Sequence, residues 1–296
     1  MKKGQLINNR YEITHEIVGD GQHSKNYVSI DLFEGNNVIL KKIQSEEEWD
    51  IWNNIRRIMK QKPNKKILQL FDSFQWNNCF YVVSEELCYN LRELLDSDSS
   101  YVQRTIPSLI HCFQYTLRYL EELQIIHCDI KPSNIMINNS GTYKLIDYGN
   151  ALIDYHSSGK GYVQSRWYRA PEVILGCQWT NKIDIWSVGC VLFECIIGDV
   201  LFPADNDVDQ LMMMRETIGL FPPSLLLRAS QDITNIFTLD GHFIEKYEVL
   251  IEERNIRELL GSCEYNEMLC LVLELEPENR MTPLEFSSIT IKYVDQ

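Results

Sequence analysis

The first part of the chain alternates short apolar runs with turn-forming polar residues. Between Tyr11 and about Ile43 these runs are separated by glycine-containing turns, which predicts three antiparallel strands in a meander. From Ser45 to Met59 the apolar residues recur at three- and four-residue spacing, which predicts an amphipathic helix with Ser45 as its N-cap. The pattern therefore indicates a sheet joined to one main helix.

The pattern changes from strands to helices after a short polar linker. Two more strands are expected over 67–74 and 79–83, and the linker follows at 84–87. Beyond it, apolar residues recur at helical spacing after Pro107, and a nearly all-apolar stretch at 184–197 is typical of a helix buried in the centre of a lobe. We expect a small sheet-rich lobe, a hinge and a larger helical lobe.

Composition and charge exclude several classes of function. The 296 residues are 45% hydrophobic, which is enough for a substantial core. With 42 acidic against 28 basic residues, the net charge of −14 argues against binding to nucleic acid and is compatible with basic peptide substrates. Nine cysteines without a C-x-x-C pair favour a reducing compartment, and no apolar run is long enough for a signal peptide or a membrane span. We expect an intracellular monomer, in the cytoplasm or the nucleus.

One stretch near the middle of the chain carries a chemically coherent set of side chains. His127, Asp129, Lys131 and Asn134 form the pattern H-x-D-x-K-P-x-N, and Asp147 follows in D-x-G after an interval of one hairpin. Phosphoryl transfer needs such a set: a carboxylate for the substrate hydroxyl, a cation for the migrating phosphate and oxygen ligands for magnesium. The pattern resembles the catalytic loop and the magnesium loop of eukaryotic protein kinases.

The resemblance to protein kinases implies a fold and a division of the chain. The fold would be α+β and bilobal, with a small antiparallel-sheet lobe carrying one main helix and a larger, mainly helical lobe. The kinase domain would span 11–293, with the N-terminal lobe at about 11–84, the hinge at 85–88 and the C-terminal lobe at about 89–293. The implied activity is transfer of phosphate from ATP, with Mg²⁺, to serine or threonine of protein substrates.

The same resemblance implies roles for the residues of the two motifs. Asp129 orients the substrate hydroxyl and accepts its proton, and Lys131 steadies the transferred phosphate. Asn134 and Asp147 ligate the magnesium ion, which bridges the phosphate oxygens.

A glycine-containing loop near the start of the chain is the expected phosphate-binding loop. Val18, Gly19 and Gly21 belong to it, and the resemblance places all three against ATP. Ser24 replaces the usual third glycine, and Asn26 replaces the valine that usually covers the adenine. From the lost apolar contact and the reduced backbone freedom we expect ATP binding to be weakened about tenfold or more, but not abolished.

Lys41 matches the lysine of the kinase pattern V-A-I-K and would reach the first two phosphates of ATP. An acid from the following helix must hold this lysine. Glu48 is our candidate, because Trp52 then occupies an apolar position that follows the glutamate in the family. Glu46 and Glu47 remain open as alternatives.

The linker between the lobes is expected to hold the adenine. In the resemblance, Glu85 and Leu87 offer main-chain groups to the edge of the base. Ser84 occupies the position that gates the pocket behind the adenine, and its small side chain predicts a large back pocket.

The second motif opens a stretch that resembles a kinase activation segment. It runs over 147–172 and ends in Ala-Pro-Glu. Its last residue, Glu172, is expected to pair with Arg280 in a buried bridge, and Asp184 is expected to bond to the backbone of the catalytic loop.

The activation segment also suggests a subfamily. Its second half, 162–172, and Cys128 in place of the usual arginine resemble the dual-specificity tyrosine-regulated kinases and their homeodomain-interacting relatives, within the CMGC group. Because the arginine that usually clamps a phosphorylated segment is missing, a phosphate on Tyr162 is expected to meet Arg166 and Arg169 instead. The resemblance implies autophosphorylation of Tyr162.

Two alternatives remain open. The stretches 175–180 and 211–214 resemble the LAMMER-type kinases, which act on arginine-serine-rich proteins. The departures in the phosphate loop leave open a weakly active pseudokinase that serves as a binding scaffold. Retention of Lys41, Asp129 and Asp147 favours an enzyme, and we expect its partners to be protein substrates, either basic or proline-directed.

Overall fold

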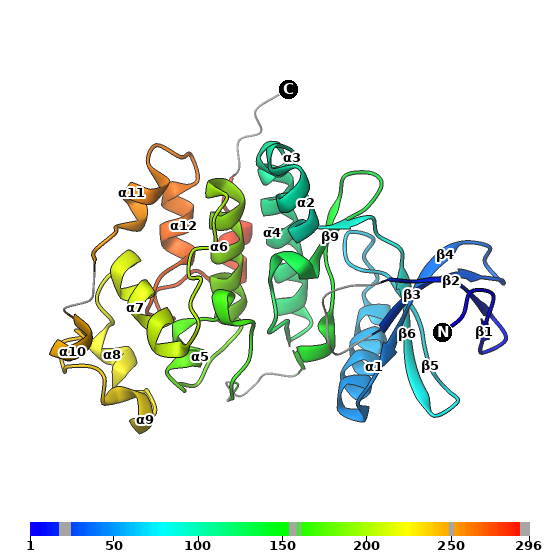
Figure 1. Cartoon of the computed structure of the whole chain (residues 1–296), viewed down its shortest axis with the longest axis horizontal. Helices are drawn as coiled ribbons and strands as arrows, with labels where there is room; N and C mark the ends of the chain where they lie inside the picture. The colour runs from blue at the N-terminus through cyan, green and yellow to red at the C-terminus, as the bar shows by residue number, and fades with distance from the viewer. Residues whose placement is uncertain (18–24, 154–158, 160, 249–251, 291–296) are drawn as a thin grey trace.

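The computed structural model describes residues 1–17, 25–153, 159, 161–248 and 252–290. It consists of a sheet-rich lobe and a larger helical lobe, which lie side by side in Figure 1. The α+β, two-lobed fold expected from the sequence is therefore confirmed.

The small lobe is built on one antiparallel sheet with the strand order β1-β2-β3-β4-β6-β5. Buried residues alternate with more exposed ones along β2 and β4, so that one face of the sheet covers a core. β1 was not expected from the sequence. The strands are β1 (Leu6–Ile7), β2 (Tyr11–Ile17), β3 (Lys25–Asp31), β4 (Asn37–Ile43), β5 (Leu70–Trp76) and β6 (Cys79–Glu85).

The hairpin between β5 and β6 shows how turn residues set the strand register. Asn77 and Asn78 adopt positive φ angles of 46° and 57°, as a two-residue turn of type I′ requires. Trp76 therefore pairs directly with Cys79, and this register holds as far as Asp72 and Val83, beyond which an irregularity shifts it before Leu70.

Two strand boundaries differ from the sequence prediction. β5 begins at Leu70 rather than at Ile67, because Ile67 and Leu68 are buried in the core that continues into the helical lobe. β6 continues to Glu85, which pairs with Val38, so the linker between the lobes is shorter than expected.

The single long helix of the small lobe, α1 (Glu46–Gln61), confirms the predicted helix. The Ser45 side chain caps it by accepting a hydrogen bond of 3.1 Å from the backbone N–H of Glu48. Trp52 and Ile55 are buried, which fixes one face of α1 inside the molecule.

The helical lobe is organised around α4 and α6, which lie next to each other in Figure 1. Every residue of α6 from 183 to 195 is buried, as its nearly all-apolar pattern predicts. The helices of the lobe are α2 (Leu91–Ser97), α3 (Ser99–Arg104), α4 (Ile106–Glu122), α5 (Pro171–Ile174), α6 (Lys182–Ile197), α7 (Asp207–Thr217), α8 (Pro223–Leu226), α9 (Gln231–Thr234), α10 (Glu245–Glu248), α11 (Ile256–Leu260), α12 (Asn266–Val272) and α13 (Pro283–Ser287).

A hairpin in the helical lobe brings the two sequence motifs together. β9 pairs antiparallel with β10 so that Ile135, directly after Asn134, faces Leu145, which lies two residues before Asp147. Both motifs therefore lie at the same end of the hairpin. The short strands of this lobe are β7 (Tyr89–Asn90), β8 (Ile125–Ile126), β9 (Ile135–Ile137), β10 (Tyr143–Leu145) and β11 (Leu152–Ile153).

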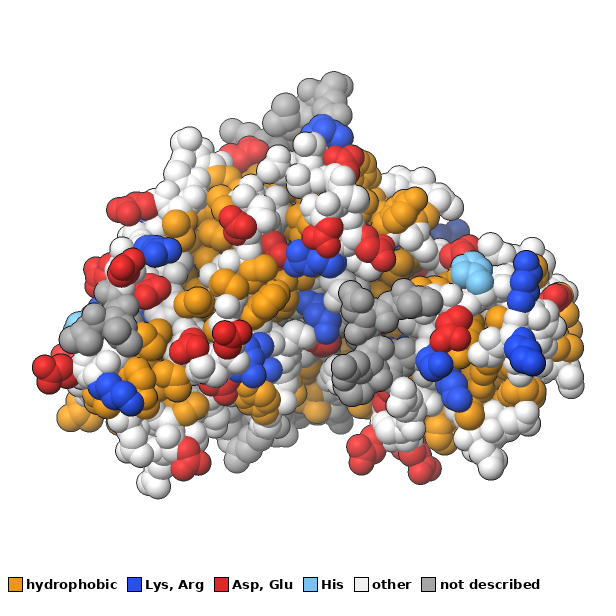
Figure 2. Space-filling view, viewed as in Figure 1, with side chains coloured by type: hydrophobic (Ala, Val, Ile, Leu, Met, Phe, Trp, Pro, Cys, Tyr) orange, Lys and Arg blue, Asp and Glu red, His pale blue; other side chains and the backbone are white. Residues whose placement is uncertain are grey.

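The surface carries acidic and basic side chains interspersed with hydrophobic ones on the face shown in Figure 2. All nine cysteines lie in the described part of the chain, and each is a free thiol. Within the same described residues, the helices are too short or too polar to cross a membrane.

Candidate active site

The carboxylate of Asp129 lies at the centre of the catalytic loop and is held from three sides. Lys131 Nζ donates to its Oδ2 at 2.9 Å, and Ser165 Oγ donates to its Oδ1 at 2.7 Å. Asn134 Nδ2 donates to the same Oδ2 at 3.1 Å and to the Asp129 carbonyl at 2.8 Å. The structure thus brings the three catalytic-loop residues together and adds Ser165, which the sequence analysis did not identify.

Asp184 of α6 fixes the backbone of the catalytic loop. Its carboxylate accepts the N–H of His127 at 2.7 Å and the N–H of Cys128 at 3.0 Å. These two bonds hold Cys128 at a positive φ of 64°, a conformation that is uncommon for a residue with a side chain. Burial raises the pKa of Asp184 to about 7, although both backbone bonds favour its charged form.

Lys41 connects the two lobes at the site. From β4 it donates a hydrogen bond to Asp147 Oδ1, and its Nζ lies 3.5 Å from Oε1 of Glu48 on α1. Glu46 and Glu47 are exposed, so the structure places Glu48 rather than either alternative beside the lysine. Burial acts to raise the pKa of Asp147, but the Lys41 ammonium outweighs it and lowers that pKa.

Gly149 allows α1 to approach the magnesium loop. A Cβ atom on this glycine would lie 2.8 Å from Oε1 of Glu48, closer than real contacts permit. Asp147 itself adopts a positive φ of 62° and accepts the Gly149 N–H at 3.4 Å. A side chain at position 149 would therefore push the Glu48 carboxylate from its present position, and no local pattern in the sequence reveals this contact.

A column of aromatic rings runs from α1 to the catalytic loop. The rings of Trp52 and Tyr148 are 6.0 Å apart, and those of Tyr148 and His127 are 4.9 Å apart, both edge to face. His127 is completely buried, and its Nε2 lies 2.9 Å from the Ile146 carbonyl. The column joins the lobes directly behind Lys41 and Asp147.

The donors present fit a magnesium–nucleotide complex. Magnesium usually takes only one or two carboxylate or amide oxygens from a protein and fills its other positions with water and phosphate. Asn134 directs its amide nitrogen to Asp129, which leaves its amide oxygen available for a cation. Asn134 and Asp147 are therefore the residues that could hold the ion.

Most of the predicted phosphate-binding loop lies outside the residues that the structure describes. Val18, Gly19, Gly21 and Ser24 lie outside the described residues. Asn26 is the second residue of β3 and pairs with Lys41, next to the expected position of the nucleotide.

The start of the linker is fixed by a buried ion pair. Lys144 Nζ donates to Glu85 Oε1 at 2.6 Å, and the Lys144 side chain is only 4% exposed. The side chain of Glu85 also accepts the Gln69 N–H at 2.7 Å, and Ser84 Oγ donates to the Glu85 carbonyl at 3.3 Å. Leu87 is buried after the bend. The sequence analysis assigned only main-chain roles to Glu85 and did not identify Lys144 as its partner.

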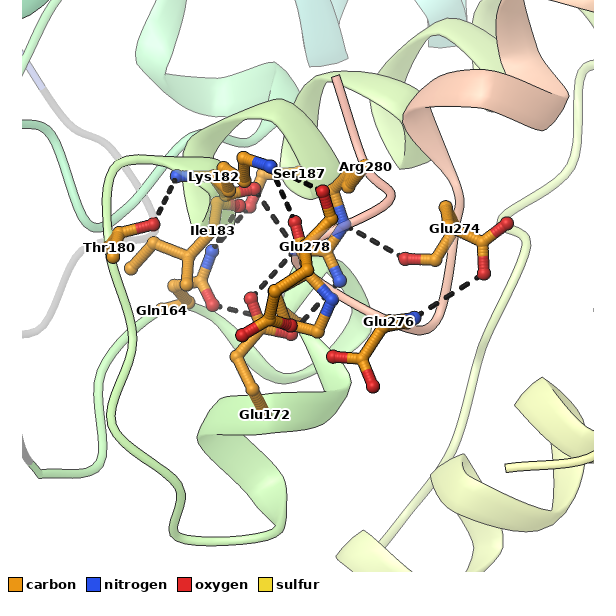
Figure 3. A network of polar contacts seen from close by, with 12 residues as sticks. Gln164, Glu172, Thr180, Lys182, Ile183, Ser187, Glu274, Glu276, Glu278 and Arg280 are labelled. Atoms are coloured by element: carbon orange, nitrogen blue, oxygen red, sulfur yellow. Dashed lines mark hydrogen bonds and ion pairs between the residues drawn. The ribbon is translucent and has the colours of Figure 1, made fainter. Parts of the chain in front are cut away.

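The end of the activation segment is tied to the last part of the lobe. Arg280 donates to both carboxylate oxygens of Glu172, at 2.7 and 3.0 Å, so the ion pair expected from the sequence is present. Arg280 also donates to the carbonyls of Glu274 and Lys182, at 2.9 and 3.1 Å. Figure 3 shows how these groups converge on the guanidinium.

The middle of the activation segment contains a second group of charges. Asp207, the first residue of α7, accepts a hydrogen bond of 2.6 Å from Tyr162 Oη and lies 3.1 Å from Arg166 and 3.5 Å from Arg169. Arg169 donates to Tyr162 Oη, and its guanidinium lies over the tyrosine ring at 3.7 Å. Tyr162 therefore lies beside both arginines, and Asp207 is an additional partner that the sequence did not predict.

The anchor of this segment is Trp179. The ring of Trp179 lies against Gly159, where a Cβ atom would approach within 2.3 Å. The two residues also exchange backbone hydrogen bonds of 2.8 and 3.1 Å, and the indole N–H of Trp179 donates to the Gly161 carbonyl at 3.1 Å. Trp179 belongs to the stretch that resembled LAMMER-type kinases, and here it positions the activation segment.

Comparison with known proteins agrees with this geometry. The family model described as protein kinase domain matches residues 11–290. The chain is 33% identical over 233 residues to dual specificity tyrosine-phosphorylation-regulated kinase 3 of Rattus norvegicus, which covers 75% of this chain and 39% of that protein. It is 34% identical over 239 residues to dual specificity tyrosine-phosphorylation-regulated kinase 4 of Homo sapiens. This match covers 75% of this chain and 44% of that protein.

The chain thus spans less than half the length of these curated relatives. A crystal structure of a kinase domain superimposes with a TM-score of 0.79 at 22% identity, covering 97% of this chain and 96% of the other. The relatives are of the tyrosine-phosphorylation-regulated type, which disfavours the LAMMER alternative. The chain belongs to the protein kinase family, and the relatives it resembles in sequence are the dual-specificity tyrosine-regulated kinases of the CMGC group.

Proposed function

We propose that this protein transfers phosphate from magnesium-bound ATP to serine or threonine in protein substrates and autophosphorylates Tyr162. The observation that carries the proposal is the convergence of residues from both lobes. Lys41 and Glu48 of the small lobe meet Asp147 of the large lobe, next to the hydrogen-bonded group of Asp129 and Lys131.

The proposed chemistry follows from the contacts of Asp129. Its carboxylate accepts the proton of the substrate hydroxyl as that oxygen bonds to the terminal phosphorus of ATP, while the bond from this phosphorus to the bridging oxygen breaks and ADP leaves. Lys131 stabilises the negative charge of the migrating group. Ser165 and Asn134 hold the carboxylate in place, so that little reorganisation is needed. The magnesium ion, held by Asn134 and Asp147 when bound, supplies charge neutralisation at the phosphates.

The lysine of the small lobe has a separate role in this proposal. Lys41 binds the first two phosphates of ATP, and Glu48 fixes the direction of its ammonium group. Val18, Gly19 and Gly21 would cover the phosphates, and the carbonyl of Glu85 and the N–H of Leu87 would meet the adenine.

The backbone next to the site favours a substrate with proline after the phosphorylated residue. Gln164 adopts a positive φ of 70°, and its carbonyl is taken up by a hydrogen bond of 2.7 Å from Arg169. Its neighbour Ser165 touches Asp129, so a substrate chain entering the site passes this backbone. The bond from Arg169 occupies one lone pair of this carbonyl and weakens it as an acceptor for a substrate N–H, so proline, which lacks that N–H, loses less there than other residues do.

We also propose an intracellular, monomeric enzyme that acts on proteins and binds neither nucleic acid nor membranes. The net charge of −14 supports basic protein substrates and disfavours nucleic acid. The nine free thiols fit a reducing compartment.

The direct test is phosphate transfer from magnesium-ATP to a basic, proline-containing peptide, measured for the native protein and for Asp147→Asn. We expect transfer by the native protein, a loss of at least about 100-fold in the variant, and phosphate on Tyr162 in the purified active protein by peptide mass analysis. Transfer no faster than that of Asp147→Asn would favour the binding-scaffold alternative.

A further inference from the structure

Two hollows lie on either side of the loop that joins α1 to β5, among the described residues and away from the active site. Their volumes are about 250 Å³ and about 950 Å³, and Asn64 and Tyr119 line both. The larger one, which we call the back cleft, is bounded by this loop, α4, the turn between β9 and β10 and the residues that end α13. Its volume lies in the range of ligand-binding clefts.

The lining of these hollows has a charge opposite to that of the chain. Acidic residues outnumber basic ones by 42 to 28 in the whole sequence. Apart from His111, the side chains of the lining that carry a charge at neutral pH are those of Arg56, Lys60, Lys62, Lys66, Arg118 and Glu122. Five of these six are cations, whereas the face in Figure 2 carries both signs interspersed. In the back cleft itself, three of the four charged lining residues are cations, namely Lys62, Lys66 and Arg118.

The ion pairs at the back cleft can open at little cost. Lys62 and Glu122 form one pair, with side chains 55% and 34% exposed, and Arg118 Nε lies 3.2 Å from the same Glu122. Arg118 also pairs through Nη1 with Glu121 at 2.8 Å, and these two side chains are 39% and 23% exposed. Exposed pairs of this kind contribute little to stability, so that an incoming carboxylate can replace Glu122. The ammonium of Lys66 lies over the Tyr115 ring, 4.5 Å from its centroid.

The floor of the back cleft is partly apolar. Tyr115 is 41% exposed, and Cys112, Tyr143 and Ile289 also line the cleft. A bound segment would therefore place an apolar side chain between its charged ones.

The back cleft also joins the two lobes. Tyr119 Oη of α4 donates to the Lys62 carbonyl at 2.7 Å, and Asn64 Nδ2 donates to Tyr115 Oη at 2.9 Å. A segment bound in the cleft would therefore contact both lobes, on the loop that follows the helix carrying Glu48.

We propose that the back cleft is a docking site for an acidic segment of a protein partner, with at least one apolar side chain between its carboxylates. The excess of cations on an acidic protein provides the charge complementarity, and the tyrosine floor accepts the apolar side chain. Docking here leaves the active site free, so the partner can be a substrate or a regulator.

The test is binding of a fluorescein-labelled peptide of alternating glutamate and leucine, followed by fluorescence anisotropy without ATP. The native protein should bind it saturably, and the corresponding uncharged glutamine–leucine peptide should not bind. The triple substitution Lys62→Gln, Lys66→Gln and Arg118→Gln should weaken binding at least about tenfold. Thermal unfolding checks that this variant is folded.

The matched control changes the net charge equally at exposed lysines elsewhere, with Lys2→Gln, Lys3→Gln and Lys246→Gln. Its affinity should stay within about twofold of the native value. Absence of saturable binding by the native protein, equal binding of the glutamine–leucine peptide, or equal weakening by both triple substitutions would overturn the proposal. Because no phosphate transfer is measured, the result does not depend on catalysis.

Discussion

Two ion-pair centres hold the activation segment, one at its end and one in its middle, and they differ in exposure. At the end, Glu172 and Arg280 make two hydrogen bonds, and their side chains are 1% and 0% exposed. In the middle, the Asp207 side chain is 30% exposed and lies between Arg166, which is 38% exposed, and Arg169, which is 7% exposed.

The difference determines which centre can change its partners. A buried ion pair cannot separate without leaving an unpaired charge in the protein interior, where the cost in free energy is high. The pair of Glu172 and Arg280 therefore stays intact in the folded protein. Water reaches Asp207 and Arg166, so their charges can move apart and accept a new partner at low cost. Tyr162, which is 57% exposed, lies at this second centre, where an added phosphate could be accommodated.

The largest effect is expected from Arg280→Leu. Glu172 would be left buried without its cation, and the free energy of unfolding should fall by about 3–5 kcal/mol in urea denaturation. The matched control is Arg254→Gln, because Arg254 pairs with Glu252 on the surface, where the side chains are 64% and 78% exposed. The control should show no measurable loss; equal losses in the two variants would contradict the distinction between buried and exposed pairs.

A smaller loss of stability is expected from Arg169→Gln, which removes the buried arginine of the ion-pair centre at Asp207. Arg169 donates to the carbonyls of Val163 and Gln164, at 2.9 and 2.7 Å, in addition to its contacts with Tyr162 and Asp207. Loss of these charge-assisted bonds should lower the free energy of unfolding by about 2 kcal/mol.

The same substitution should also lower the rate of phosphate transfer, by at least about tenfold, because Gln164 precedes Ser165 and the contact with Asp129. Arg166→Gln is the matched control, with an expected loss of stability below about 1 kcal/mol, since its pair with Asp207 is partly exposed. If Arg166→Gln proved as damaging as Arg169→Gln, burial would not explain the difference.

These two centres also show how far the sequence predicts the site. Glu172 and Arg280 lie 108 positions apart, and only the family motifs connected them. Asp207 was missed, because its contact with Tyr162 depends on where α7 is packed and leaves no local signal. Lys144 was missed as the partner of Glu85 for the same reason.

Elements whose stability depends on residues near one another in the sequence were predicted well. The α1 helix followed from the apolar spacing and the Ser45 cap, both of which act within one or two turns. The start of β5 was wrong because Ile67 and Leu68 look like strand residues but pack into the core shared with the helical lobe. Glu48 was a candidate from spacing, and what distinguishes it structurally from the exposed Glu46 and Glu47 is its contact with Lys41 at 3.5 Å.

A third prediction concerns phosphorylation of Tyr162 in the presence of Asp207. The phosphate adds about two negative charges beside the Asp207 carboxylate, so part of its attraction to Arg166 and Arg169 is offset by repulsion. Asp207→Asn removes this repulsion. Phosphorylation should therefore stabilise the Asp207→Asn protein by about 1 kcal/mol more than it stabilises the native protein.

The measurement is urea unfolding of four samples, the native protein and the variant, each with and without phosphate on Tyr162. Asp209→Asn serves as the control, since Asp209 is also in the first turn of α7 and its backbone N–H is capped by Asn206. Equal stabilisation by phosphate in all backgrounds would show that Asp207 and the phosphate do not compete for the arginines.

The smallest effect is expected from Tyr162→Phe in the unphosphorylated protein. Burial, with the Asp207 carboxylate and its hydrogen bond, raises the pKa of the Tyr162 phenol, so at neutral pH the side chain is a neutral donor. Removing its hydroxyl leaves Asp207 bonded to the arginines, and the free energy of unfolding should fall by only about 0.5–1 kcal/mol. A loss as large as that from Arg280→Leu would mean that the middle of the segment is as rigid as its end. The arginines could then not move from Asp207 to a phosphate on Tyr162 without local unfolding, because the unmodified hydroxyl would already be essential to the packing of this segment.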